Sequence, residues 1–364
     1  MEGCTNNPIG DVVTKPTSSM LQAIAENTLL DDVFMEDTTT NSLQEYVAKI
    51  TNHEAGLLVM SGTMGNGLAL RTHLMQPPHS VLCDSRADII NFESGGVPAF
   101  TGAHLCGVVP QNGVHLTLED IKKHAVISDD VHSCPTKVVC LENTLGGMIM
   151  PLDETRRISE WTHANDIKLH LDGARLWEAV VSGAGSLPEF ASLFDSVSLC
   201  FSKGLGAPIG SIIVGPNEFI KKARWFRKMI GGGTRQSGII AAPARVAVEE
   251  TFGTGPNGEG GKLAATHARA KKVAEMWISK GGKLAREVQT NMVWLDLDAA
   301  GLPDDAMEGI AKSNGLNILG NRVVIHYQIS DEAIERLGNV MDTVLSSSFV
   351  PQGNSGGPRG HTLA

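Results

Sequence analysis

The chain has 364 residues with 30 basic and 40 acidic side chains, a formal net charge of −10 and 42% hydrophobic residues, which is ordinary globular composition. The acidic balance, without a long Lys/Arg run, excludes the electrostatic surface that nucleic acid or a membrane-surface helix requires. No apolar stretch approaches the roughly 20 residues that span a bilayer, so we expect neither nucleic acid nor membrane among the partners.

The N-terminal residues lack the basic and apolar segments of a signal peptide, so we expect a flexible arm over 1–8 and a cytoplasmic protein. The six cysteines are scattered and show no Cys-x-x-Cys spacing. We therefore expect small buried side chains rather than a disulfide framework or a metal site.

Apolar runs that end in polar or glycine-rich residues recur along a large domain expected over 9–250. A helix is predicted from Ser61–Thr63 to Leu74, and strands are predicted at Lys137–Leu141, Ile167–Leu171 and Ser196–Phe201. Near-continuous apolar strands suit a mostly parallel sheet covered by helices, and hence an α/β fold. Ligands of such sheets bind at the carboxyl ends of the strands.

A Gly- and Pro-rich stretch over 251–262 is predicted to be a linker. It contains a G-x-G-x-x-G pattern at Gly253, Gly255 and Gly258, but no strand precedes it and no helix start follows closely. We therefore reject a dinucleotide site and expect a flexible loop.

A smaller α/β domain is predicted over 263–349, followed by a disordered tail over 350–364. Its expected elements are a helix at Leu263–Lys280, a strand at Met292–Leu297, a helix near Asp304–Lys312, a strand at Arg322–Tyr327 and a helix at Asp331–Ser347.

Two chemically active side chains follow neighbouring strands: Asp172 after the run that ends at Leu171, and Lys203 after the next. Each alone is better explained as a cap or a solvated charge. Together they indicate a pyridoxal phosphate (PLP) site, in which the lysine amine forms a Schiff base and the carboxylate pairs with the pyridinium nitrogen. Gly62 and Thr63 open a helix whose N–H groups suit a phosphate, although a plain helix cap is a common alternative.

Several motifs then carry a family resemblance. They are Glu54-Ala55-Gly56, Ser61-Gly62-Thr63, Leu141-Glu142-Asn143-Thr144, His170-Leu171-Asp172-Gly173-Ala174-Arg175, Ser202-Lys203, Gly206-Ala207-Pro208-Ile209-Gly210-Ser211 and Gly231-Gly232-Gly233-Thr234-Arg235-Gln236. As a set, matching from about Asp11 to Tyr327, they resemble the PLP-dependent threonine aldolases, most closely the fungal low-specificity type.

The resemblance implies a fold-type-I PLP enzyme, a homotetramer or homodimer with active sites at the interface, that cleaves threonine-type amino acids to glycine and an aldehyde. By this resemblance Lys203 is the Schiff-base lysine and Asp172 the partner of the pyridinium nitrogen. Cofactor binding is assigned to Gly62, Thr63 and Ser202, and Arg235 is expected to bind the cofactor phosphate of a neighbouring subunit. The substrate carboxylate is expected to bind Arg175 and Arg322.

The sequence departs from the family pattern around the substrate. Asp88 stands where the family usually has a histidine stacked on the cofactor, and Gly146 aligns with a second histidine of many relatives. Gly10, Phe34 and Met35 replace the serine, tyrosine and glycine of the family pattern. Because the cofactor residues are retained, PLP binding is more secure than aldol cleavage.

Three functions stay open. The first is aldol cleavage, which the missing histidines weaken because a general base contributes about 10²–10⁴-fold. The second is an alanine racemase that supplies D-alanine, for example to a peptide synthetase, with Lys203 and Asp88 as proton donors on opposite faces. The third is a non-catalytic PLP-binding subunit, which the retained site residues disfavour.

Overall fold

A computed structural model describes residues 10–346 of the protein. The expected arm over 1–8, the tail over 350–364 and Cys4 lie outside these residues. The described chain forms two compact units, one of residues 16–261 and one of residues 10–15 with 262–346.

The larger unit is built on a seven-stranded sheet in the order β1-β7-β6-β5-β4-β2-β3. Its strands are β1 Ala55–Val59, β2 Ser80–Asp84, β3 His104–Val108, β4 Thr136–Glu142, β5 Lys168–Asp172, β6 Ser196–Cys200 and β7 Ser211–Gly215. Strands β3, β2, β4, β5 and β6 pair in parallel, and β7 pairs antiparallel with β6 and with β1. The predicted mostly parallel α/β sheet is confirmed.

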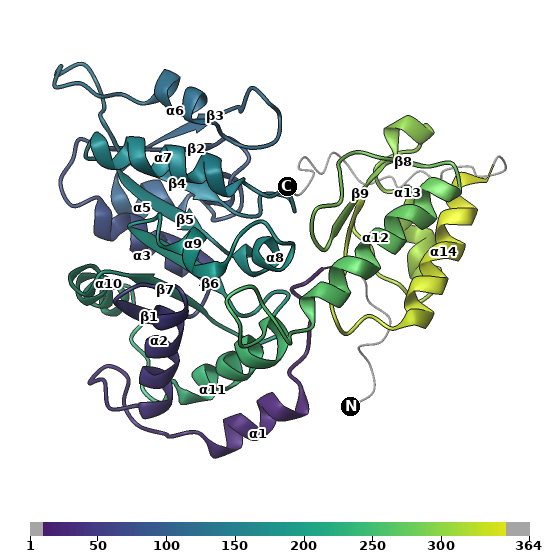
Figure 1. Ribbon diagram of the computed structural model, residues 1–364, viewed down its shortest axis with the longest axis horizontal. Coiled ribbons are helices and arrows are strands. Elements are labelled where there is room, and N and C mark those ends of the chain that lie inside the picture. Colours follow the sequence, from purple (N-terminus) through teal and green to yellow (C-terminus); the bar gives the residue numbers. More distant parts are fainter. Residues whose placement is uncertain (1–9, 347–364) are drawn as a thin grey trace. The chain divides into compact units, whose positions relative to one another are not determined.

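Helices cover both faces of this sheet, with α3 and α5 on one and α7 and α9 on the other (Figure 1). This double cover explains why central strands such as β2 and β6 are buried at every position. The helices are α1 Ser18–Glu26, α2 Thr38–Ile50, α3 Gly62–His73, α4 Asp88–Asn91, α5 Gly96–Thr101, α6 Leu118–His124, α7 Leu152–Ala164, α8 Leu176–Val181, α9 Leu187–Ala191, α10 Asn217–Met229, α11 Gly238–Ala247 and the π-helix η1 Val248–Phe252.

The glycine-rich stretch expected to be a linker is instead largely folded onto the larger unit, which extends to Gly261. Gly253 bridges to Gly260, and the Leu187 N–H donates to the Pro256 carbonyl at 2.9 Å. A Cβ at Gly258, where φ is +80°, would lie 2.5 Å from Val181. The glycines here permit close packing and left-handed backbone, so their number does not indicate flexibility.

The smaller unit contains the predicted helices and strands with small shifts at their ends. They are α12 Leu263–Ser279, β8 Lys283–Leu284, β9 Met292–Asp296, the 3₁₀ turn η2 Asp298–Ala300, α13 Ala306–Ser313, β10 Arg322–Val324 and α14 Asp331–Leu345. The three strands form an antiparallel sheet in the order β10-β9-β8. Residues 10–15, expected in the large domain, belong here because the Lys15 N–H and carbonyl both bond to the Gln328 side chain.

The five described cysteines are free. Cys83, Cys140 and Cys200 are buried as expected, whereas Cys106 and Cys134 are partly exposed. Cys106 lies on β3, the edge strand of the large sheet, where a neighbouring strand covers only one side. The prediction of burial is therefore wrong for these two.

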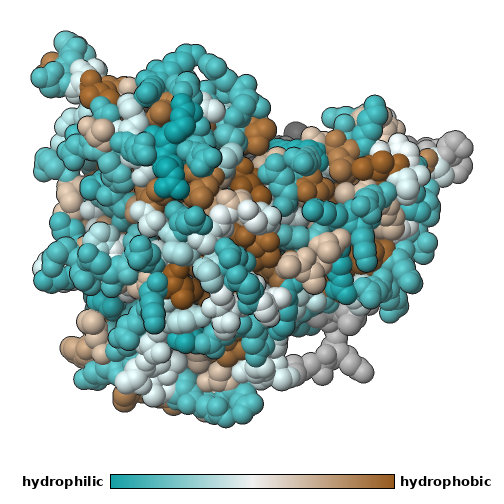
Figure 2. Space-filling view, in the orientation of Figure 1, coloured by the Kyte–Doolittle hydropathy of each residue, from teal (hydrophilic) through white to brown (hydrophobic). Residues whose placement is uncertain are grey.

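Between residues 10 and 346 no helix is both long and apolar enough to span a membrane. In the view of Figure 2 the surface is mostly hydrophilic, with small separate hydrophobic patches.

Candidate active site

Polar side chains meet where β4, β5 and β6 end. Glu142 and Asp172 are the last residues of β4 and β5 and are paired in register. Lys203 follows the end of β6 by three residues. Parallel strands end at one edge of the sheet, so the two candidates from the sequence and Glu142 lie at that edge.

Asp172 is buried, with 3% exposure. Its Oδ2 accepts from Asn66 Nδ2 at 2.7 Å, and its Oδ1 accepts from the backbone N–H of Ala174 at 3.0 Å. Both of these hydrogen bonds come from neutral groups. Such a carboxylate suits a cationic ligand group, because burial of a charge is favourable only when it is paired and hydrogen-bonded.

Two further carboxyl groups surround this position. Burial and the nearby charge of Asp172 raise the pKa of Glu93 to about 8. Burial, followed by the charges of Asp88 and Asp172, raises the pKa of Glu142 well above its usual range. Glu93 therefore holds a proton at neutral pH and can act as a proton donor, and the pKa of Glu142 is shifted in the same direction.

The amine of Lys203 lies within electrostatic reach of these acids, because its charge lowers the pKa values of Glu93 and Glu142 against the effect of burial. Lys203 is partly exposed in the loop between β6 and β7. Gly206 in this loop has a φ of +89°, a conformation that favours glycine. The loop thus presents an amine beside the buried acids.

The start of α3 approaches the same edge. The Ser61 hydroxyl caps the helix by accepting from the Met64 N–H at 3.1 Å, so the plain cap exists. A Cβ at Gly62 would lie 2.9 Å from the Cys200 sulfur, so glycine lets the helix start pack on the end of β6. The first N–H groups of the helix, with the exposed Thr63, are suited to a phosphate.

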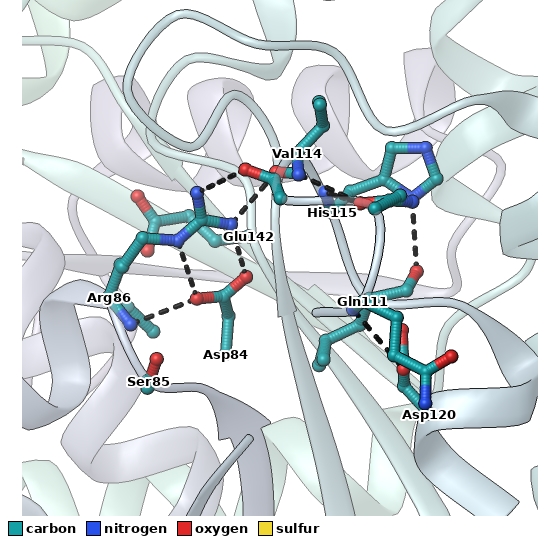
Figure 3. Close-up of polar contacts among 12 residues, drawn as sticks. Asp84, Ser85, Arg86, Gln111, Val114, His115, Asp120 and Glu142 are labelled. Atoms are coloured by element: carbon teal, nitrogen blue, oxygen red, sulfur yellow. Dashed lines mark hydrogen bonds and ion pairs between the residues drawn. The ribbon is translucent and has the colours of Figure 1, made fainter. Parts of the chain in front are cut away.

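Asp88 begins the short helix α4, and its backbone N–H donates to Glu142 Oε2 at 3.0 Å. Arg86, two residues earlier, binds both oxygens of Asp84 at 2.9 and 2.7 Å and the carbonyls of Gly113 and Val114 at 2.9 Å each. Figure 3 shows this guanidinium between Asp84 and the loop, next to Glu142. The Arg86 contacts therefore fix the backbone from which Asp88 projects.

The position aligned with the second histidine lies in a turn. Gly146 has a φ of +58°, a left-handed conformation that glycine adopts without strain. Thr144, two residues earlier, has a buried hydroxyl with no hydrogen-bond partner among the described residues. A polar ligand group would satisfy this hydroxyl.

The predicted arginines are distributed over different regions. Arg175 lies close enough to the sheet edge for its charge to lower the pKa of Cys200 against the effect of burial. Arg235 is 55% exposed, forms an ion pair with Asp31 at 2.6 Å and lies 5.9 Å from the Phe34 ring centroid. Arg322 belongs to the smaller unit, where it begins β10 with its guanidinium 5.7 Å from the Trp294 ring centroid.

The remaining predicted positions can also be placed. Ser202 is partly exposed next to Lys203. Gly10 belongs to the smaller unit and is buried, whereas Phe34 and Met35 are 71% and 56% exposed.

Sequence reasoning missed Asn66 and Glu93. Asn66 Nδ2 donates to Glu93 Oε1 at 2.9 Å as well as to Asp172. Their sequence signals are weak: an amide in the first turns of a helix, and a single carboxyl before Gly95-Gly96. Neither pattern is specific without the fold.

These residues fit PLP. Lys203 supplies an amine, Asp172 an ionic partner for the ring nitrogen, and Ser61–Thr63 a phosphate cradle at a helix start. The unpartnered Thr144 hydroxyl and the neutral donors on Asp172 are both consistent with a polar, cationic ligand.

Comparisons with known proteins agree with this chemistry. The model of the beta-eliminating lyase family matches residues 9–300. The chain is 52% identical to aldolase vrtJ of Penicillium aethiopicum over 93% of this chain and 86% of the other. It is 45% identical to alanine racemase TOXG of Cochliobolus carbonum over 95% and 89% of the two chains.

The same resemblance extends to further aldolases. The low specificity L-threonine aldolase of Saccharomyces cerevisiae is 42% identical over 91% of this chain and 84% of the other. The structure of a Leishmania major threonine aldolase aligns with a TM-score of 0.78 at 18% identity, covering 94% of this chain and 100% of the other. This last likeness supports the fold alone.

Proposed function

The chain belongs to the beta-eliminating lyase family and is a PLP-dependent enzyme, and from this premise we propose that it cleaves threonine-type β-hydroxy amino acids to glycine and an aldehyde. One observation carries the proposal. Asp172, buried and hydrogen-bonded by neutral donors, ends the strand next to the one that leads to Lys203.

When bound, PLP draws electrons from Cα of an attached amino acid and so weakens the bonds at that carbon. The residues of the chain set up this chemistry. Lys203 Nζ anchors the cofactor, Asp172 holds the ring nitrogen protonated, and Gly62 and Thr63 with the partly exposed Ser202 hold the phosphate end.

The substrate is oriented through its carboxylate. Arg175, next to the sheet edge of the larger unit, offers a planar guanidinium group that matches a carboxylate with two hydrogen bonds. For Arg322, in the smaller unit, the same role stays a prediction of the family resemblance. Arg235 is assigned to the cofactor phosphate of a neighbouring subunit in a homodimer or homotetramer. In the single chain the Arg235 guanidinium is exposed and forms an ion pair with Asp31. A phosphate group can replace Asp31 as its partner.

Aldol cleavage requires a base for the β-hydroxyl proton. We assign this role to the Asp88 carboxylate, because no imidazole stands at position 88 or 146. The neighbouring Glu142 has a pKa well above its usual range through burial and the charge of Asp88. Asp88 is thus proposed as the proton acceptor and Glu142 as the adjacent acid.

Alanine racemisation is the second candidate. It needs no base for a hydroxyl group, so the absence of both histidines favours it, as does the 45% identity to alanine racemase TOXG. In that reaction Lys203 serves one face of the substrate, and Asp88 serves the other. A role in secondary metabolism in the cytoplasm accords with both candidates.

Proton NMR of the holoenzyme in D₂O distinguishes these reactions. L-Threonine, L-allo-threonine and L-alanine are incubated separately, and the alanine is analysed on a chiral column. Glycine and acetaldehyde from threonine support the proposal. D-alanine deuterated at Cα, without aldehyde from either threonine isomer, replaces aldol cleavage by racemisation. A protein that binds PLP but turns over none of the three would be a non-catalytic subunit.

A further inference from the structure

A line of hydrogen bonds leads from Asp172 into the interior of the larger unit. Asn66 Oδ1 lies 3.1 Å from His170 Nε2, and His170 Nδ1 lies 2.8 Å from Ser196 Oγ. The same Ser196 oxygen lies 2.8 Å from His73 Nε2. Asn66, His170 and Ser196 are each at most 1% exposed, so water does not compete for these bonds.

The hydrogen bonds that Asn66 donates to Asp172 and Glu93 fix the position of every other proton in this line. The Asn66 NH₂ group donates to Asp172 and to Glu93, so its oxygen faces His170. His170 Nε2 must therefore carry a hydrogen. Burial lowers the pKa of His170 to about 4, so the ring is neutral and its Nδ1 accepts.

The outer half of the line is ordered by the same reasoning. Because His170 Nδ1 accepts, the Ser196 hydroxyl donates to it. The Ser196 oxygen then accepts from His73 Nε2–H. The His73 ring is held in place by stacking on Phe219, with 4.6 Å between the ring centroids. Every donor thus points toward Asp172, and aligned hydrogen bonds of this kind strengthen one another in a low-dielectric interior.

We propose that Asn66, His170, Ser196 and His73 form a positioning relay that orients the Asp172 carboxylate as the partner of a cationic ring nitrogen. The inference rests on the proposed PLP function. None of the four residues is assigned a role in the reaction itself. The relay acts only through the orientation of the Asp172 carboxylate.

Four variants of the full-length protein test the relay. His170→Leu removes both hydrogen bonds, whereas His170→Gln keeps one donor and one acceptor on a neutral side chain. Ser196→Ala disconnects His73 but leaves the bond between Asn66 and His170. His53→Leu is the control, because His53 is a partly buried histidine whose Nε2 bonds to the Ala191 carbonyl, outside the relay.

The readouts are the dissociation constant of PLP, titrated into apoprotein by its visible absorbance, and the Tm of each apoprotein. We expect affinity to fall about tenfold or more in His170→Leu, and about two- to threefold in Ser196→Ala and His170→Gln. His53→Leu should lower Tm without changing the affinity. A purely structural role for His170 predicts the same pattern for both leucine variants.

Unchanged PLP affinity in His170→Leu, or equal losses in His170→Gln and His170→Leu, would overturn the relay. If His170→Leu does not fold, the other variants decide. Unchanged PLP affinity in Ser196→Ala overturns the role of Ser196 and His73. An equal loss of PLP affinity in His170→Gln and in His53→Leu overturns the role of His170 and Asn66. Wild-type protein that binds PLP without turnover contradicts the proposed reaction but leaves the relay standing. Wild-type protein that binds no PLP removes both.

Discussion

The cofactor side and the substrate side of the site are built from different kinds of structure. Asp172 ends a strand whose register with β4 and β6 is fixed by parallel pairing, and Gly62 begins a twelve-residue helix packed on β6. Asp88 instead begins the four-residue helix α4, and Gly146 lies in a turn with positive φ. Short helices and turns tolerate substitutions that sheet edges do not.

This structural difference coincides with the places where the sequence departs from the family pattern. Asp172, Gly62 and Thr63, which are assigned to the cofactor, stand at a strand end and a helix start and match the family pattern, whereas the departures Asp88 and Gly146 stand on a short helix and in a turn. The chain therefore retains the cofactor chemistry, and its reaction is decided by the substrate side. Four predictions test this division, starting with the largest expected effect.

Lys203→Ala should abolish turnover and the visible absorbance of lysine-bound PLP, because Lys203 is the amine whose charge acts on Glu93 and Glu142 at the ends of the strands. Absorbance spectra and product NMR measure both. Lys168→Ala is the control, since Lys168 begins β5 at the opposite edge and pairs with Asp195 at 2.9 Å. A yellow, active Lys203→Ala protein would disprove the site.

Asp172→Asn should weaken PLP affinity roughly 10- to 100-fold, because a charged hydrogen bond to the cofactor is replaced by a neutral contact. Titration of the apoprotein with PLP measures this change. Asp195→Asn, at the start of β6 and so at the other end of the sheet, should leave the affinity unchanged. Equal PLP affinities for wild type and Asp172→Asn would contradict the assignment of Asp172 as the partner of the cofactor ring nitrogen.

Asp88→His tests the substrate side alone. An imidazole at this position should raise kcat/KM for L-threonine cleavage by about tenfold, within the range of general-base catalysis. PLP affinity should remain within about twofold of wild type, since the cofactor side is unaltered. A loss of PLP binding in this variant, but not in the exposed control Asp130→His, would show that the two sides are not separable.

Glu93→Gln should change the pH dependence of stability more than the activity. The pKa of Glu93 is raised to about 8 in the folded state, above its unfolded value of about 4.5. Between these values the folded apoprotein binds one more proton than the unfolded chain, so stability falls as pH rises.

Glu93→Gln should remove about one proton from this dependence, so its apoprotein Tm falls less from pH 5 to 8 than that of wild type. Thermal unfolding at several pH values measures the difference. Glu160→Gln, at an exposed position of α7, is the control. Parallel pH curves for wild type and Glu93→Gln would mean that Glu93 is ionised in the fold.

The sequence alone predicted the parts of the protein that local pattern determines. Apolar runs predicted buried strands, and the polar residues that follow them, Asp172 and Lys203, predicted the edge at which a ligand binds. This works because side-chain burial along a strand and the direction of parallel strands are both properties of contiguous residues.

The tertiary structure decided which side chains act together. Asn66 is 106 residues from Asp172 and 27 from Glu93, yet it hydrogen-bonds to both. His73 and Ser196 are 123 residues apart. The raised pKa of Glu93 comes from burial and from neighbouring charges on other elements, and Gly258 is required because Val181 of α8 lies against it. Such properties depend on desolvation and distance, which only the folded chain fixes.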